Sequence, residues 1–206
     1  MAKIIVFSNQ KGGTGKSTLC VQYANYLASQ GKGVAVLDAD LQQSIIHLRQ
    51  REMATNPDFQ LPWGVWSATS NTRAFMEKAA SMDGYVLVDC PGTLNDTNLL
   101  PVFKAATAII IPFRYDDLIV DSTIMFVKVL RKNAINAKVF FQPNMIDARV
   151  KIQSEEHIKT ILREAGYILP RIKQGVAVQR ASTLTQDNYQ QLAVMHAVEE
   201  FVLNID

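Results

Sequence analysis

Hydrophobic residues in this chain gather into short continuous runs, and amphipathic stretches separate these runs. The runs are typical of buried strands and cover Ile4–Phe7, Val34–Leu37, Tyr85–Asp89, Ala108–Pro112 and a fifth segment from Val139. The amphipathic stretches are typical of helices and cover Ser17–Gln30, Ile45–Met53, Thr72–Met82, Leu118–Arg131 and Asp187–Ile205. This alternation predicts an α/β fold with a doubly wound, mostly parallel sheet and helices on both faces.

Length and composition fit one ordinary globular domain spanning 1–206. The chain has 206 residues, of which 48% are hydrophobic and 19% charged, and its formal net charge is +2. No apolar run approaches the ~18 residues of a membrane span, so we expect a cytoplasmic protein without a membrane anchor. Cys20 and Cys90 have neither disulfide-scaffold density nor metal-ligand spacing, and we expect both in the core.

The loop Asn9–Thr18, between the first strand and the first helix, has the composition of a phosphate-binding loop. Glycines at this position expose successive backbone N–H groups at a helix N-terminus, where the helix dipole favours anions. Lys16 would reach the β- and γ-phosphates, and the Ser17 hydroxyl would hold Mg²⁺. The expected nucleotide-binding residues are Gly12, Gly13, Thr14, Gly15, Lys16, Ser17 and Thr18.

Carboxylates follow two of the other predicted strands. Asp38 and Asp40 come after Val34–Leu37, and Asp89 ends the run that begins at Tyr85. The carboxyl ends of parallel strands are the edge of an open sheet at which ligands bind. We therefore expect Asp38 and Asp89, together with Ser17, to be metal ligands.

Three boxes in this order resemble those of the ParA/MinD family of ATPases. The string K-G-G-x-G-K-[ST], with its extra Lys11, is similar to the family's deviant Walker A box, although Gln10 occupies the first glycine position of the standard loop. The segment Asp38–Ser44 resembles the D-x-D-P-Q box, with Leu41 in place of proline. The strand ending in Asp89-Cys90-Pro91-Gly92 resembles the Walker B segment, in which Gly92 would let the following segment move.

The resemblance implies roles for individual residues. Lys11 would cross a dimer interface to the partner's nucleotide, and Asp40 would position the attacking water, so Lys11, Lys16 and Asp40 are the expected catalytic residues. Asn144 matches the asparagine that contacts the nucleobase. The spacing of Asn144 and Asp147 is also similar to the N-K-x-D guanine box, but Met145 replaces its lysine. Adenine is favoured because the other boxes belong to the ATPase branch. The segment Phe113–Asp121 is a candidate dimer interface, and Asp116 and Asp117 within it are expected to cap the following helix.

The family further implies a plasmid-partition ATPase that forms a homodimer on ATP, binds DNA non-specifically and associates with the nucleoid. A centromere-binding partner of the ParB type would stimulate its slow hydrolysis. Between Lys138 and Ser182 there are eight basic residues and four acidic ones, a local excess that fits a polyanion. By position, the candidate DNA contacts are Arg149, Arg171, Lys173 and Arg180.

Two other classes of protein remain as alternatives. A MinD-like or other positioning ATPase would carry a cargo other than DNA, but the acidic residues Glu199 and Glu200 in the last helix disfavour its membrane-anchored form. An iron–sulfur electron-transfer ATPase would bridge a cluster with cysteines, and the positions of Cys20 and Cys90 are poor for this. Because the first strand begins at once, we expect no N-terminal helix-turn-helix extension.

Overall fold

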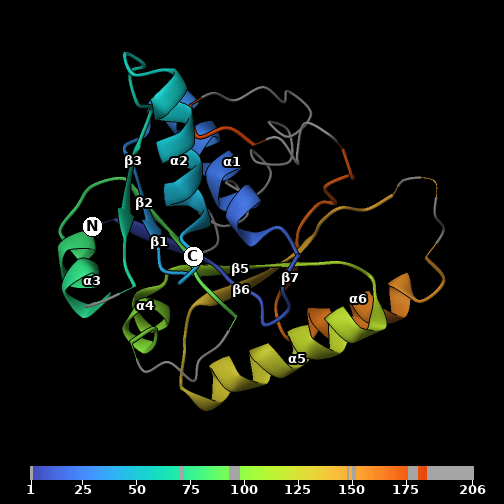
Figure 1. Ribbon diagram of the computed structural model, residues 1–206. Coiled ribbons are helices and arrows are strands. Elements are labelled where there is room, and N and C mark those ends of the chain that lie inside the picture. Colours follow the sequence, from blue (N-terminus) through green and yellow to red (C-terminus); the bar gives the residue numbers. More distant parts are fainter. Residues whose placement is uncertain are drawn as a thin grey trace.

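Seven parallel strands form one sheet in the computed structural model, which describes residues 2–69, 72–92, 98–147, 149, 152–175 and 181–184. The strand order is β3-β2-β4-β1-β5-β6-β7 (Figure 1). The bounds are β1 Lys3–Phe7, β2 Val34–Asp38, β3 Gly64–Ser67, β4 Tyr85–Asp89, β5 Ala108–Phe113, β6 Lys138–Pro143 and β7 Tyr167–Ile168. The chain fills one side of β1 first and then the other, which confirms the predicted doubly wound sheet.

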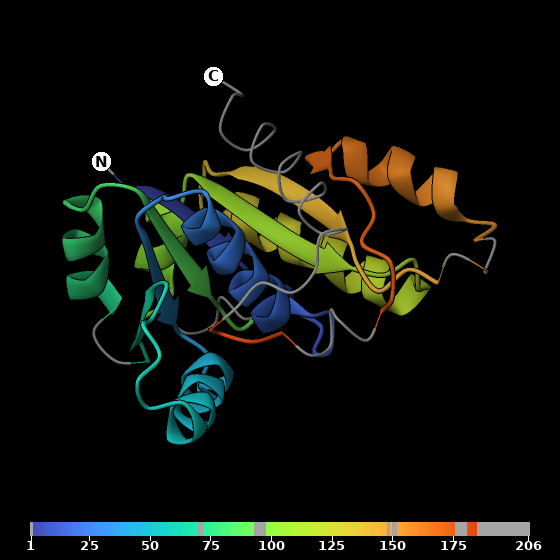
Figure 2. The ribbon, with the colours of Figure 1, turned by 90° about the horizontal axis from the view of Figure 1, so that it is seen from above.

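Helices cover both faces of the sheet, as the sequence predicts. Their bounds are α1 Lys16–Ser29, α2 Ser44–Thr55, α3 Thr72–Ala80, α4 Leu100–Ala105, α5 Asp117–Lys132 and α6 Glu155–Arg163. Successive residues of β1 point to opposite faces: Ile5 packs in a cluster with α1, whereas Val6 packs in a second cluster with α4, α5 and α6. Figure 2 shows α1 and α5 on opposite faces. No helix within the described ranges is long and apolar enough to cross a membrane.

The long, periodic elements match their predicted bounds to within one or two residues, whereas four short elements were not predicted. Strand β7 has two residues, α4 has six and includes Pro101 in its first turn, and β3 carries a glycine, so none gives a strong periodic signal. Helix α6 is the fourth, and its buried Ile158 and Leu162 are four residues apart. The expected helix Asp187–Ile205 lies outside the described residues.

The two cysteines pack in the core as predicted. Cys20 and Cys90 are free thiols, both fully buried, and burial raises the pKa of each well above its usual value. Trp63 lies in the core, while Trp66 is 48% exposed on the edge strand β3. Thiols at the centre of the core are poorly placed to bridge a cluster between subunits.

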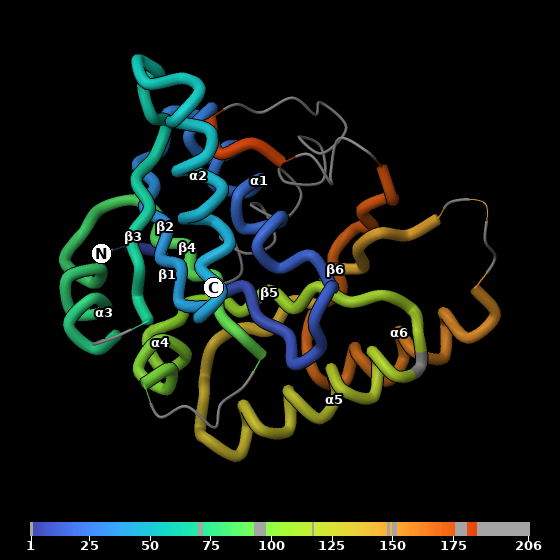
Figure 3. Tube along the Cα trace, viewed as in Figure 1, coloured from blue at the N-terminus to red at the C-terminus, as the bar shows by residue number. Residues whose placement is uncertain are grey.

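A buried arginine on α2 joins three distant parts of the chain. The Arg49 guanidinium lies 4.2 Å from the centroid of the Trp63 ring and donates hydrogen bonds to the Trp63 carbonyl at 3.0 Å and to Thr183 Oγ1 at 2.7 Å. Glu52, one turn further along, accepts from the Thr183 N–H at 2.9 Å. We call Arg49, Glu52, Trp63 and Thr183 the α2 clamp. Figure 3 shows the segment 181–184 beside α1 and α2.

Helix α1 supports the same segment. The Asn25 side chain donates to the Ser182 carbonyl at 2.7 Å and accepts from the Trp63 indole N–H at 2.8 Å. The clamp and Asn25 together therefore satisfy buried polar groups from four segments, and the cation–π contact of Arg49 adds roughly 0.5–2 kcal/mol.

The Arg49→Met substitution should destabilise the protein by roughly 2–4 kcal/mol, because it leaves buried acceptors on Trp63 and Thr183 unpaired while keeping most of the side-chain volume. Urea unfolding measures the change. Arg51→Met, on the exposed side of the same helix, is the control and should change stability by no more than about 0.5 kcal/mol. Equal effects of the two substitutions would contradict the role assigned to the clamp.

Candidate functional site

The phosphate-binding loop lies at the carboxyl edge of the sheet, between β1 and α1. Gly13 and Gly15 have positive φ angles of 73° and 90°, which side chains rarely adopt. Gln10, at the first glycine position of the standard loop, has no positive φ and is exposed. The missing glycine therefore imposes no strain. Lys11 is exposed, and Lys16 and Ser17 are partly exposed in the first turn of α1.

The exit of β4 packs directly against the start of this loop. Ser8 Oγ donates to the Pro91 carbonyl at 2.9 Å. A Cβ atom on Gly92 would lie 1.9 Å from the Asn9 carbonyl oxygen and 2.1 Å from Gln10 Cα, so no side chain fits at position 92. Gly92 is thus explained by this close approach of two backbones. Its proposed freedom of movement stays a prediction, because 93–97 lie outside the described residues.

Strand register brings the predicted carboxylates together next to the loop. Asp38 and Phe7 both pair in register with Asp89. Both aspartates are fully buried. Among the described residues, neither carboxylate oxygen of Asp89 receives a hydrogen bond of ordinary geometry, although the Ser17 hydroxyl is near enough to lower the pKa of Asp89, and Asp38 Oδ1 also has no partner. Three buried acceptor atoms without donors fit a cation, because desolvated carboxylates are otherwise costly.

Asp38 also has a structural role that the sequence did not predict. Its Oδ2 accepts hydrogen bonds from the Ile45 N–H at 3.0 Å and the Ile46 N–H at 3.2 Å, in the first turn of α2. Asp38 therefore caps α2 with one oxygen and leaves the other for a ligand. Asp40 is partly exposed, and its Oδ1 accepts from the Gln42 N–H at 3.0 Å. This turn forms without the family's proline, and Leu41 in its place is 83% exposed.

Burial dominates the electrostatics of the two buried acids. It raises the pKa of Asp89 to about 7, and the nearby Asp38 charge acts in the same direction. The Ser17 hydroxyl and the Lys16 ammonium oppose this rise, so both lie close to Asp89. Burial also raises the pKa of Asp38, against the lowering effect of its backbone hydrogen bonds. Lys16, Ser17, Asp38 and Asp89 thus form one electrostatically coupled group.

Asn144 contacts the phosphate-binding loop in this structure. It follows β6, is fully buried, and its Nδ2 donates to the Thr14 carbonyl at 2.8 Å. A Cβ atom on Gly15 would lie 2.4 Å from this nitrogen, which gives Gly15 a second reason to be glycine. Among the described residues Asn144 Oδ1 has no partner. The predicted contact with the nucleobase stays a prediction, and Oδ1 is the atom left for it.

A nucleotide-binding domain model, described as CobQ/CobB/MinD/ParA, matches residues 5–189. The chain belongs to this family. The match covers most of the sequence and includes the loop and both acidic strand ends, so the resemblance seen in the three boxes is confirmed. In this family member the deviant loop and the paired carboxylates share one edge of the sheet.

Solved structures share this fold at low sequence identity. A Borrelia burgdorferi protein described as a plasmid partition protein, bound to AMPPNP, is 18% identical, with a TM-score of 0.76 and 99% of both chains covered. MinD in the MinC:MinD complex of Aquifex aeolicus is 18% identical, with a TM-score of 0.72, covering 100% of this chain and 97% of that one. MinD with Mg-ADP from Pyrococcus horikoshii is 19% identical, with a TM-score of 0.72, covering 98% and 96%. No curated protein matches this sequence.

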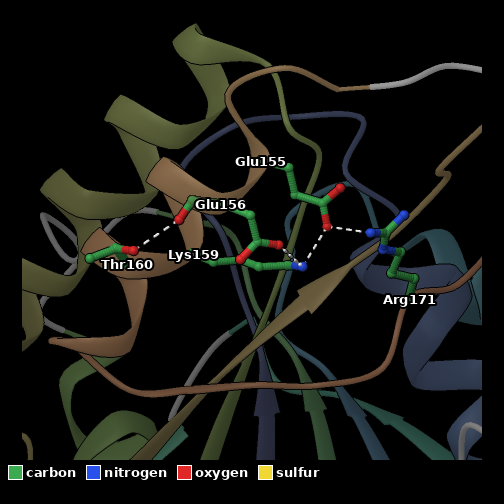
Figure 4. Close-up of polar contacts among 5 residues, drawn as sticks. All are labelled: Glu155, Glu156, Lys159, Thr160 and Arg171. Carbon is green, nitrogen blue, oxygen red and sulfur yellow. Dashed lines mark hydrogen bonds and ion pairs between the residues drawn. The ribbon is translucent and has the colours of Figure 1, made fainter.

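Two of the predicted DNA contacts are paired with acids. Arg149 is 89% exposed but binds Asp147 through two side-chain hydrogen bonds, and this pairing lowers the pKa of Asp147 to about 2. Arg171 pairs with the buried Glu155 (Figure 4). Only Lys173 of the four is exposed with no ion pair to another described residue, and Arg180 lies outside the described ranges.

Glu155 is the centre of this charge network. Its Oε1 contacts both Arg171 and the Lys159 ammonium, the latter at 2.7 Å, and Lys159 also reaches Glu156 at 2.8 Å (Figure 4). Two cations and two carboxylates therefore balance. Fewer unpaired basic side chains are therefore left to bind a polyanion in this region than the count of eight from the sequence suggests.

Within the candidate dimer segment Phe113–Asp121, Asp116 caps a helix as predicted. Its side chain accepts from the Ile119 N–H at 3.3 Å and caps α5. The side chain of Asp117 is not among those described.

The stability of the ligand-free protein should fall as the pH rises from about 4 to about 7. Folded Asp89, with a pKa of about 7, keeps a proton that the unfolded chain has released above pH 4, so deprotonation costs roughly 4 kcal/mol at most. Asp89→Asn removes this titration and should raise the melting temperature at pH 8 by several degrees while changing it little at pH 4. The control Asp58→Asn, on an exposed loop, should follow the wild type, and a pH-independent difference would refute the assignment.

Proposed function

We propose that this protein is an ATP hydrolase of the partition type, which forms a homodimer on ATP and binds DNA non-specifically in that state. The observation that carries the proposal is the set of unpaired buried carboxylate oxygens on Asp38 and Asp89 beside Lys16 and Ser17. ATP and Mg²⁺ are the ligands that such a cradle accepts. The AMPPNP and Mg-ADP bound by structural neighbours support the same choice.

Each residue of the cradle has a distinct task in this proposal. The N–H groups of Gly12–Thr18 and the Lys16 ammonium bind the β- and γ-phosphates. Ser17 and Asp89 hold Mg²⁺, which when bound offsets phosphate charge, and Asp38 supports it from the second strand. Asp40 orients the attacking water, and the exposed Lys11 contacts the nucleotide of the partner subunit. A ParB-type partner then accelerates a slow reaction.

A second function is favoured by a specific observation. The arginines Arg149 and Arg171 are paired with acids, which leaves a weaker polyanion surface than the sequence suggests. MinD is also among the structural neighbours. A positioning ATPase that carries another cargo through another surface is therefore the alternative, and DNA binding distinguishes the two functions.

The test of function is binding to random-sequence duplex DNA at one moderate salt concentration with ATP, with ADP and without nucleotide, because phosphate contacts depend strongly on salt. Wild type should bind only with ATP. Lys16→Ala should lose nucleotide and DNA together, Lys11→Ala should keep nucleotide but lose dimer and DNA, and Asp40→Ala should trap the ATP dimer on DNA. Equal binding in all three nucleotide states, or none, would favour the positioning function.

Lys173 is the cation expected to contribute most clearly among the described DNA candidates. Lys173→Ala should weaken DNA binding and lower the slope of log affinity against log salt by about 1. Lys132→Ala, at the exposed end of α5, is the matched control. An unchanged slope for Lys173→Ala would remove this residue from the interface.

A further inference from the structure

Asn9, directly before Gln10 and Lys11, uses its whole side-chain amide inside the protein. It is fully buried, and its Nδ2 donates to the Pro112 carbonyl at 2.7 Å and to Thr123 Oγ1 at 3.1 Å. Its Oδ1 accepts from the Lys11 N–H at 3.2 Å. Because a carbonyl can only accept, Nδ2 must face Pro112, and this fixes Oδ1 toward Lys11.

The turn that carries Lys11 has little other support. Lys11, Gly12 and Gly13 are exposed, and a Cβ atom on either glycine would meet nothing within 4 Å. The residues before the turn are held firmly, since Gly92 packs against the Asn9 and Gln10 backbone. Within the described residues, two side chains bond to the Lys11 backbone: Asn9 Oδ1 accepts from its N–H at 3.2 Å, and the Thr14 hydroxyl donates to its carbonyl at the longer distance of 3.5 Å. Of the two, Asn9 is the one that joins the turn to the firm base before it.

Thr123 holds Asn9 from the opposite side. It lies within α5, more than 100 residues away in sequence, and is fully buried. Its hydroxyl is the second acceptor for Nδ2, so it fixes the amide plane that aims Oδ1. Without this acceptor a buried N–H would lose its partner, and the amide would gain freedom to rotate.

We infer that Asn9 and Thr123 are a positioning pair that holds the Lys11 turn in the orientation needed to reach the nucleotide of a second copy of this chain. The inference rests on the proposed cross-dimer role of Lys11. It makes α5 part of the device that sets dimer affinity, although α5 contributes no residue to the nucleotide cradle itself. A backbone turn that is ordered before association loses less entropy when the dimer forms.

The test uses Thr123→Val, which keeps the side-chain shape but removes the acceptor, and Thr123→Ser, which keeps the hydroxyl. Affinity for a fluorescent ATP analogue is measured at monomer concentrations, and dimerisation with AMPPNP is measured by sedimentation. Thr123→Val should leave nucleotide affinity within about twofold and weaken dimerisation about 2- to 12-fold, the range of one hydrogen bond. Thr123→Ser should restore it, which a purely structural role of the methyl group would not do.

Amide hydrogen exchange at Lys11 gives a second readout that needs no dimer. Thr123→Val should speed exchange of the Lys11 N–H several-fold, and Thr123→Ser should not. If wild type stays monomeric with AMPPNP, the proposed function fails and dimer control fails with it, whereas faster exchange would still support the positioning pair. If wild type dimerises and Thr123→Val matches it in both readouts, the inference alone is overturned.

Discussion

The alignment of strand ends in a parallel sheet is the constraint on which the rest of this structure depends. Because β2 and β4 pair with Asp38 opposite Asp89, and β1 pairs with Phe7 opposite Asp89, three strands finish at one level. The phosphate-binding loop leaves from one of them and the two acids end the others. Residues that are far apart in the sequence therefore lie close together because of the strand register, and their side chains need no direct contact with one another.

This alignment gathers buried negative charge, and the structure compensates for it only in part. The α2 N-terminus supplies donors to Asp38, and Lys16 and Ser17 favour ionised Asp89, yet burial still raises the pKa of both acids. The remaining cost is the kind that a bound cation removes. The unpaired oxygens and the family's nucleotide chemistry are therefore two independent reasons to expect a cation at this site.

Much of this arrangement could be predicted from the sequence, because it depends on local signals. Continuous apolar runs such as Val34–Leu37 predict the strands, and the glycines of the loop predict the turn. The acids directly after two of the strands are then placed at the carboxyl edge of the sheet. Partners such as Asn9 with Thr123, Arg49 with Thr183 and Glu155 with Arg171 could not be predicted. They are set by how helices pack on the sheet, and counting charges along the chain does not show which charges are paired.

Helix α2 carries a consequence of its own. Its first turn is capped by Asp38, and Arg49 in its middle and Glu52 one turn later hold the segment 181–184. A helix of 12 residues is a stiff rod about 18 Å long. Because Asp38 and the segment 181–184 both bond to α2, a shift of the helix at Asp38 would strain the hydrogen bonds of Arg49 and Glu52 to Thr183. Helix α2 therefore connects the carboxylate of Asp38 mechanically to the segment 181–184.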